Sequence, residues 1–198
     1  MLFFTVAVLS NEMVNENKLK EDYYDLIVTV SELFKDHAQT GERFYNRSYQ
    51  SEREVAELLD GKVTEKGFRA IVDTLFEEYD DLFVYRQPYQ EYLNDALDFT
   101  LSSKRNNYYT TVRNSLLNPA LKLVGFDQFE IYHEENKIFV EADKIEVNYY
   151  EQGEREAQHH QYARYGFPPS DNISVNLTFV HQDGKYLLDQ FNVISHGM

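Results

Sequence analysis

Two segments near the end of the chain alternate apolar and polar residues on either side of an Asp183-Gly184 pair. A period of two places the apolar side chains on one face of a β-strand. An Asp-Gly pair between such segments favours a two-residue type I′ turn, because both turn residues need a positive φ. Residues 173–180 and 186–195 therefore predict a long antiparallel hairpin.

The phase of the alternation changes within two of the predicted strands. In residues 137–151 the apolar positions change from even to odd numbers near residues 143–144, and residues 186–193 show a similar change near residues 189–190. A β-bulge inserts one residue, shifts the alternation and bends the strand. We therefore expect two bulges in a sharply curved antiparallel sheet. The alternative is that the second half of each segment is buried on both faces, so that its parity carries little information.

The N-terminal half has apolar residues at spacings of three and four, the period of an amphipathic helix. Residues 18–45 carry one such stripe. Ser51 begins a capping-box pattern for a second helix, and Thr64 is the expected cap of a third, whose buried stripe extends to Phe76. A fourth helix is expected in residues 89–102.

From about residue 107 the apolar period shortens towards two. Residues 108–112 and 120–150 therefore resemble strands. The polar residues 154–171 interrupt this pattern and predict either a loop or a short helix ending at Gly166.

These patterns predict a single α+β domain in residues 18–198. Residues 18–104 are expected to be helical and residues 105–198 to be rich in β-structure. The N-terminal helices would pack on a curved antiparallel sheet of four to six strands. With 42% hydrophobic residues in a chain of 198, the sequence is able to bury a core of this kind.

The formal net charge of -15 restricts the partners of the chain. A field of this sign repels the phosphates of nucleic acids and anionic membrane surfaces, so nucleic-acid binding is disfavoured. A protein partner, in particular a basic one, is favoured, although the charge also has a simpler role in solubility. The chain has no Cys, which excludes disulfides, a thiolate nucleophile and cysteine ligands to zinc.

Residues 1–17 begin with the apolar run "MLFFTVAVLS" and continue as a charged lead-in. The run is too short to span a membrane, and no other segment approaches the necessary length. It is similar to the hydrophobic region of a signal peptide but has no positive region before it, which suggests a clipped export signal or anchor. This interpretation predicts an extracytoplasmic, cell-envelope location. The alternative is an ordinary buried strand or helix start in a cytoplasmic protein.

The order of elements ends in the hairpin segment "LTFVHQDGKYLLDQFNVI". Helices followed by a long, bent antiparallel meander of this kind resemble the NTF2-like (cystatin-like) extracytoplasmic domains of Gram-positive bacteria. Tyr186 or Leu187 stands where those domains often have Trp. The resemblance implies a cone-shaped sheet with a cavity. It does not imply one function, because this architecture includes isomerases, dehydratases, binding modules and immunity proteins.

The resemblance to NTF2-like domains implies that an enzyme of this kind would place a His or Asp in the cone as a general base. His37, expected on the first helix beside Asp36, is the strongest candidate for this role, with a solvated surface histidine as the simpler interpretation. Asp80 and Asp81 follow a predicted helix end and are more typical of a turn. No Walker, Rossmann, GxSxG or HExxH motif is present.

His159 and His160 are adjacent, with Glu154 and Glu156 nearby. Adjacent side chains diverge on a helix or strand, whereas helical metal ligands are typically four residues apart. We therefore predict no metal site here, and no cofactor.

Tandem tyrosines predict a contact surface instead. Adjacent residues of a strand face opposite sides of a sheet, so one member of each pair should be exposed, and exposed tyrosines are frequent in protein contacts. The alternative is packing of amphipathic side chains. The predicted contact residues are Tyr108, Tyr109, Tyr149, Tyr150, Tyr162 and Tyr165.

The sequence therefore predicts a non-catalytic binding or accessory domain that acts through protein or small-ligand contacts. One alternative is an acidic, immunity-type inhibitor of a toxin. A second alternative is an isomerase or dehydratase that uses the cone as its pocket.

Overall fold

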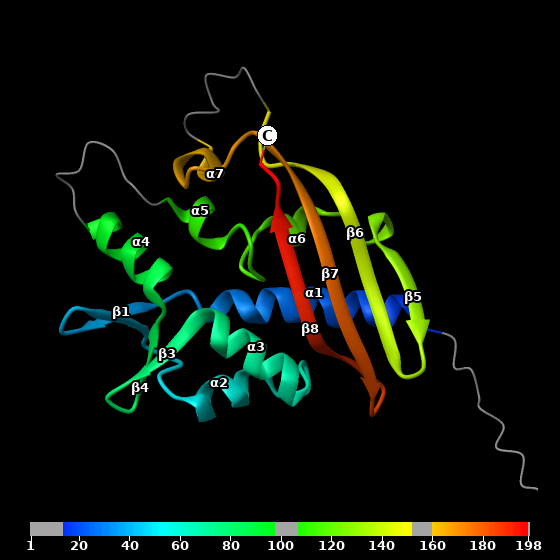
Figure 1. The fold of residues 1–198 in the computed structure, drawn as a ribbon, viewed down its shortest axis with the longest axis horizontal. Helices are drawn as coiled ribbons and strands as arrows, with labels where there is room; N and C mark the ends of the chain where they lie inside the picture. The colour runs from blue at the N-terminus through cyan, green and yellow to red at the C-terminus, as the bar shows by residue number, and fades with distance from the viewer. Residues whose placement is uncertain (1–13, 98–106, 152–159, 198) are drawn as a thin grey trace, which may run out of the picture.

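The computed structural model describes residues 14–97, 107–151 and 160–197 (Figure 1). These residues form an α+β fold with two antiparallel four-stranded sheets, ordered β1-β2-β4-β3 and β5-β6-β7-β8. The strands are β1 (His37–Thr40), β2 (Arg43–Asn46), β3 (Phe76–Tyr79), β4 (Leu82–Tyr85), β5 (Glu130–Glu134), β6 (Lys137–Asn148), β7 (Ser170–Gln182) and β8 (Lys185–Ser195). The helices are α1 (Glu16–Glu32), α2 (Glu52–Leu59), α3 (Glu65–Leu75), α4 (Gln87–Leu97), α5 (Tyr108–Val112), α6 (Ala120–Leu123) and α7 (Gln161–Arg164), with a 3₁₀ turn at Phe126–Gln128.

Both predicted bulges are confirmed in the larger sheet. The register of β6 against β7 shifts between Ala142 and Ile145. In β8, Leu188 pairs with Phe179 and Gln190 pairs with Thr178, which leaves Asp189 as the extra residue. A bulge bends a strand and increases its twist, and Figure 1 shows the long strands β6 and β7 bending along their length.

The hairpin between β7 and β8 is also confirmed. Asp183 has a φ of 51° and Gly184 a φ of 75°. Positive φ at both turn residues is the requirement of a type I′ turn.

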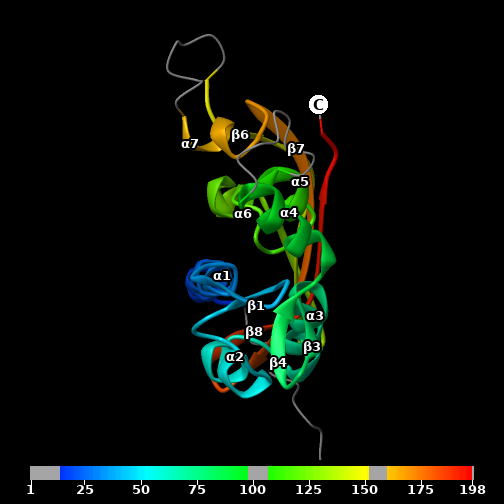
Figure 2. The same ribbon diagram turned by 90° about the vertical axis from the view of Figure 1, so that its left-hand side faces the viewer.

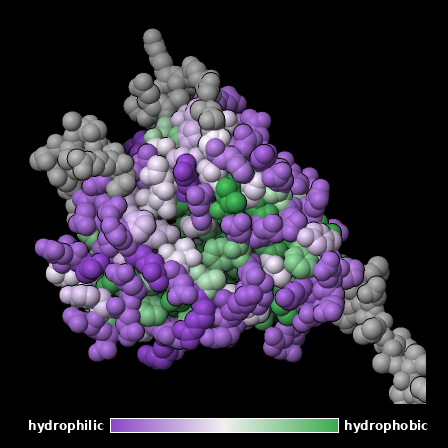
Figure 3. Space-filling view, in the orientation of Figure 1, coloured by the Kyte–Doolittle hydropathy of each residue, from purple (hydrophilic) through white to green (hydrophobic). Residues whose placement is uncertain are grey.

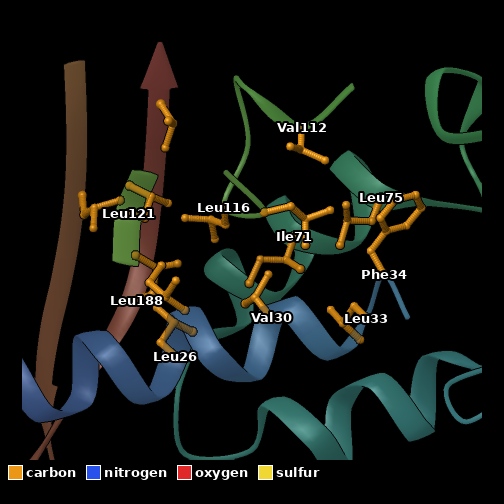
Figure 4. Close-up of a cluster of buried hydrophobic side chains, with 14 of the residues drawn as sticks. Leu26, Val30, Leu33, Phe34, Ile71, Leu75, Val112, Leu116, Leu121 and Leu188 are labelled. Carbon is orange, nitrogen blue, oxygen red and sulfur yellow. The ribbon is translucent and has the colours of Figure 1, made fainter. Parts of the chain in front are cut away.

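One face of the larger sheet is covered by helices. Figure 2 shows α1 and α6 on the same side of β7 and β8. Between sheet and helices lies a core of buried side chains (Figure 4). Its labelled members come from α1 and the two residues after it, α3, the 112–121 segment and β8: Leu26, Val30, Leu33, Phe34, Ile71, Leu75, Val112, Leu116, Leu121 and Leu188.

The predicted caps of α2 and α3 are confirmed. Ser51 accepts a hydrogen bond from the backbone of the third residue of α2, and Thr64 accepts one from Gly67 N at 3.1 Å. Thr64 also contacts β8, because its Oγ1 donates to Asp189 Oδ1 at 2.7 Å. The first turn of α3 is therefore attached to the bulge residue of the larger sheet.

The prediction of one helix over residues 18–45 was wrong in its second half. Helix α1 ends at Glu32, and residues 37–46 form a β-hairpin. Asp36 and Gly41 have positive φ values of 44° and 57°, which no helix interior accepts. The two strands have four residues each, too few to establish a visible period of two.

A second hairpin interrupts the part expected to be helical. Phe76 belongs to β3 and not to the end of α3. Asp80 and Asp81 form the turn between β3 and β4, with φ values of 48° and 62°, in agreement with their prediction as turn residues.

The expected start of the β-rich part at residue 105 was also wrong. Residues 108–112 and 120–123 are short helices, and the larger sheet begins at Glu130. Asn107 and Thr110 form a reciprocal capping box that starts α5. Capping and packing thus outweigh the β-propensity of "YYTTV".

The expected short helix before Gly166 is present as α7, and Gly166 has a φ of 81°. The expectations for residues 1–13 lie outside the described residues, whereas residues 16 and 17 already belong to α1. Within the described ranges, no helix has the length and apolar character that crossing a membrane requires.

Candidate functional site

The six tyrosines of the predicted contact surface gather around the ring of Phe167. Phe167 is buried, and its ring centroid lies 4.8–6.1 Å from those of four of them: Tyr108, Tyr109, Tyr149 and Tyr162. The hydroxyl of Tyr150 donates to Phe167 O at 3.0 Å. The ring of Tyr165 lies 5.6 Å from that of Tyr108. Three segments that are distant in sequence therefore meet in one aromatic cluster.

Two of the six do not lie on an accessible surface. Tyr109 and Tyr149 are 8% and 4% exposed. The hydroxyl of Tyr109 donates to Asp171 Oδ2 at 2.9 Å, and that of Tyr149 donates to Asn118 Oδ1 at 3.2 Å. Both therefore hold elements together inside the protein. Tyr109 lies on a helix, so the expected alternation of a strand does not apply to it.

The other four remain accessible to different degrees. Tyr108, Tyr150 and Tyr162 are half-buried, and Tyr165 is 51% exposed. Three of these, Tyr108, Tyr162 and Tyr165, line one side of a cleft of about 500 Å³ between α1, the 116–122 segment and α7.

Apolar and polar side chains share the remaining surface of this cleft. Phe34, Leu116 and Leu117 supply apolar lining, while Lys35 and Lys122 supply two ammonium groups. A second hollow of about 240 Å³ is lined by Tyr92 and Arg164 and shares Tyr108 and Tyr165 with the cleft. Aromatic walls with a few polar groups are typical of ligand pockets.

A close backbone contact holds the segments that carry Tyr108 and Tyr165 together. Tyr109 N donates to Tyr165 O at 3.2 Å. A Cβ added at Gly166 would lie 2.4 Å from Cγ of Asn107, the cap of α5. Because Gly166 also has a positive φ, only glycine fits here without strain.

Lys122 carries the least compensated charge of the cleft. Its Nζ donates to Ser31 Oγ at 3.2 Å, and in the described part of the chain no carboxylate lies within 4 Å of it. Partial burial lowers the pKa of Lys122, and the charge of Lys35 lowers it further, while Glu32 acts in the opposite direction. Lys35 itself is paired with Glu32 at 2.6 Å.

The hydroxyls of Tyr108 and Tyr162 are neutral at physiological pH. Burial raises the pKa of Tyr108 and that of Tyr162 above the ordinary tyrosine value. The described lining contains no Asp, Glu or His. The cleft therefore offers hydrogen bonds, rings and positive charge, but its described lining has no histidine or carboxylate to act as a general base.

His37 lies outside this lining and begins β1, so its expected place on the first helix was wrong. Its Nδ1 lies 3.2 Å from Tyr85 Oη, and its ring packs 4.8 Å from that of Phe34. Burial of the ring lowers the pKa of His37, although the residue keeps an exposed edge. Asp36 is paired with Arg47 at 3.4 Å.

Of the adjacent histidines, only His160 belongs to the described residues; His159, Glu154 and Glu156 do not. The Nδ1 of His160 accepts a hydrogen bond from Tyr162 N at 3.4 Å and caps α7. Within the described ranges, no three His, Cys, Asp or Glu residues are arranged to hold a metal ion.

A second surface lies on the opposite face of the larger sheet. Within the described ranges no helix covers this face, which is turned towards the viewer in Figure 1. Figure 3 shows apolar patches within a hydrophilic surface there. The rings of Tyr132 and Phe139, which are cross-strand partners, stack 4.9 Å apart at 12°.

Carboxylates surround this aromatic pair. Glu130 and Glu141 are directly opposite each other on β5 and β6. A hydrogen bond to Glu141 raises the pKa of Tyr132, and the charges of Glu134 and Glu130 raise it further. Tyr132 is 42% exposed. We define Glu130, Tyr132, Glu134, Phe139 and Glu141 as the acidic sheet face.

The tandem tyrosines of the sequence do not indicate Tyr132, Lys35 or Lys122. The signal for Tyr132 was available, since it follows the inward-facing Ile131 and must point to the other face. Lys35 and Lys122 meet only through tertiary packing, so no local pattern indicates them.

No model of a known protein family matches the chain, and no curated protein matches its sequence. The function is therefore inferred from the chemistry of the cleft and of the acidic sheet face.

Proposed function

We propose that this protein is a non-catalytic binding domain whose aromatic cleft holds a small organic ligand. The observation that carries the proposal is the cleft of about 500 Å³ with Tyr108, Tyr162 and Tyr165 on one side. Pockets for small molecules typically measure about 300–1,000 Å³ and combine apolar walls with few polar groups. The absence of a His or carboxylate from the described lining favours binding over an isomerase or dehydratase reaction.

The rings offer a stacking surface that is already in place. Tyr108 is held by Phe34, whose ring is nearly parallel at 16° and 6.1 Å away, and by Tyr92 at 5.6 Å. Contacts of this kind restrict the rotamers of Tyr108 before any ligand arrives. Pre-organised side chains lose less conformational entropy on binding.

The test is binding of a neutral aromatic probe, 2-naphthamide, followed by its fluorescence. Replacing Tyr165, the most exposed ring of the cleft, by Ala should weaken binding about three- to tenfold, the contribution of one aromatic contact. Tyr79→Ala is the matched control, because Tyr79 is similarly exposed at 44% but belongs to β3. Equal affinities of wild type and Tyr165→Ala would contradict the proposal.

The NTF2-like resemblance and the cell-envelope location are part of the same proposal. Helices on one face of a bulged antiparallel sheet support the resemblance. The space between helices and sheet is filled by the core, and the void among Val30, Ile71 and Phe191 measures only about 10 Å³. In this proposal the ligand therefore occupies the cleft beside α1 and not the concavity of the sheet.

A second candidate function is inhibition of a basic protein by the acidic sheet face. The specific observation is Tyr132 and Phe139 stacked among three carboxylates on an uncovered face. Charge complementarity of this kind accelerates association and weakens in salt. Capture from source lysate with wild type and with a Glu130→Gln, Glu141→Gln double variant tests it. A basic protein that binds only the wild type and is released by 0.5 M salt (about a 4 Å Debye length) is the expected result; equal capture by both proteins contradicts it.

A further inference from the structure

We infer that the ligand of the aromatic cleft is an aromatic carboxylate. Its ring lies against Tyr108, Tyr162 and Tyr165, and its carboxylate binds the ammonium group of Lys122. This inference rests on the proposed function and narrows the ligand to one chemical class. It follows from a contrast between the charge of the cleft and that of the chain.

The cleft is locally basic although the chain has a formal net charge of -15. Lys35 and Lys122 both line it, and Arg164 lines the hollow that adjoins it. The described lining contributes no carboxylate. The neighbouring ammonium groups repel each other, as the effect of Lys35 on the pKa of Lys122 indicates, and an anionic ligand would relieve that repulsion.

The two ammonium groups are not equivalent. Lys35 is already satisfied by Glu32 at 2.6 Å, so it contributes mainly through its field. Lys122 has only the neutral hydroxyl of Ser31 at 3.2 Å. An ammonium has three donors, so Lys122 keeps donors for an incoming anion. Its partial withdrawal from water strengthens a charge-assisted hydrogen bond to that anion.

The remaining lining selects a ring as the rest of the ligand. Tyr108, Tyr162 and Tyr165 present aromatic surface, and Leu116 and Leu117 present apolar surface. Gln161, which also lines the cleft, has an amide that donates and accepts. A planar apolar ligand with one carboxylate satisfies the rings and Lys122 together, whereas a neutral ring leaves the ammonium group without a counter-charge.

The test compares three naphthalene probes that differ in charge: 2-naphthoate, neutral 2-naphthamide and cationic 2-naphthylmethylamine. Wild-type protein should bind 2-naphthoate about tenfold or more tightly than 2-naphthamide, the effect of one charge-assisted hydrogen bond. Lys122→Gln should reduce this preference below about threefold. Lys20→Gln is the matched control, because Lys20 is an exposed residue of α1 outside the lining of the cleft.

The other outcomes of the three-probe test separate a failure of the carboxylate inference from a failure of the proposed function. If both neutral and anionic probes bind equally and Tyr165→Ala weakens both, the cleft binds ligands but the carboxylate inference is overturned. Tighter binding of the amine overturns it as well, and so does a preference for 2-naphthoate that survives in Lys122→Gln. If none of the probes binds at millimolar concentration, the proposed function fails together with the inference. Circular dichroism of each variant confirms that it is folded.

Discussion

The hydroxyl of Thr64 donates a hydrogen bond to the carboxylate of Asp189, 2.7 Å away, and so joins the start of α3 to the bulge of β8. Asp189 is available for this contact because it is the extra residue of the bulge. Two backbone hydrogen bonds strengthen the junction: Thr64 N donates to Leu188 O, and Leu188 N donates to Lys62 O, both at 2.9 Å. The irregularity in the strand is therefore the docking point of a helix.

Gly67→Ala tests how closely α3 packs against β8. Ala normally stabilises a helix interior relative to Gly by about 0.5–1 kcal/mol. Here an added Cβ would lie 2.1 Å from Leu188 O, a backbone atom that cannot move aside easily. We expect a loss of about 1–3 kcal/mol in the free energy of unfolding, measured by urea denaturation. Gly125→Ala is the control, since its Cβ would meet only the flexible ends of the Asp127 and Gln128 side chains.

Asp171→Ala tests the buried cluster at the end of β8. Asp171 is 1% exposed and accepts hydrogen bonds from Tyr109 Oη, Ser195 Oγ and Gly197 N. Removing the carboxylate leaves at least one of the Tyr109 and Ser195 hydroxyls, which also contact each other at 2.9 Å, without an acceptor, at about 1–3 kcal/mol for each group that water cannot reach. We expect a total loss of at least about 2 kcal/mol by urea denaturation, and a smaller loss for Tyr109→Phe, which removes one donor. Similar values for the two variants would contradict a central role of Asp171.

The pH dependence of stability tests the environment of His37. Burial lowers its pKa in the folded state, so the unfolded chain takes up a proton at higher pH than the folded chain. This contribution to stability is complete above the ordinary histidine pKa of about 6.5 and decreases as the pH falls through that value towards the folded-state pKa. The neighbouring Asp36 opposes the shift. We expect His37→Gln to reduce the loss of stability between pH 7.5 and pH 5.5, measured by urea denaturation; an unchanged loss would show that other groups account for it.

Two carboxylates of the acidic sheet face, Glu130 and Glu134, should respond differently to replacement by Gln. Glu130 lies directly opposite Glu141, and like charges opposite each other destabilise a sheet. Glu130→Gln should therefore stabilise the protein by about 0.2–1 kcal/mol, and 0.5 M salt should reduce this gain. Glu134 lies opposite Lys137, so Glu134→Gln should have no stabilising effect. The measurement is thermal unfolding of the wild type and both variants at low and high salt. A gain in stability for both variants would contradict a specific repulsion between Glu130 and Glu141.

The larger sheet could be predicted from the sequence because its strands are long. With 11 to 13 residues each, β6, β7 and β8 show the alternation, and β6 and β8 also show the phase shifts at the bulges. The Asp183-Gly184 turn can be predicted locally, because an Asp-Gly pair favours the positive φ values of a type I′ turn. The four-residue strands β1 to β4 are too short to show an alternation and are not joined by an Asp-Gly turn. Phe76, the first residue of β3, also fits the end of the helical stripe before it.

The candidate site could be predicted only in part. The tandem tyrosines pointed to the right segments, yet which member is buried depends on α5 and on partners such as Asp171 and Asn118. Lys122 reaches the cleft because α6 packs beside α1, and its contact with Ser31 crosses most of the N-terminal half of the chain. Such long-range contacts leave no trace in local periodicity.

The contact between Gly166 and Asn107 restricts how this site can change during evolution. Since no other residue fits at position 166 without strain, the backbone segments that carry Tyr108 and Tyr165 are held at one separation. Related proteins with new preferences would then keep this glycine and exchange side chains at the rim, such as Lys122 or Gln161. A homologue that has lost the glycine should have lost the recognition site altogether.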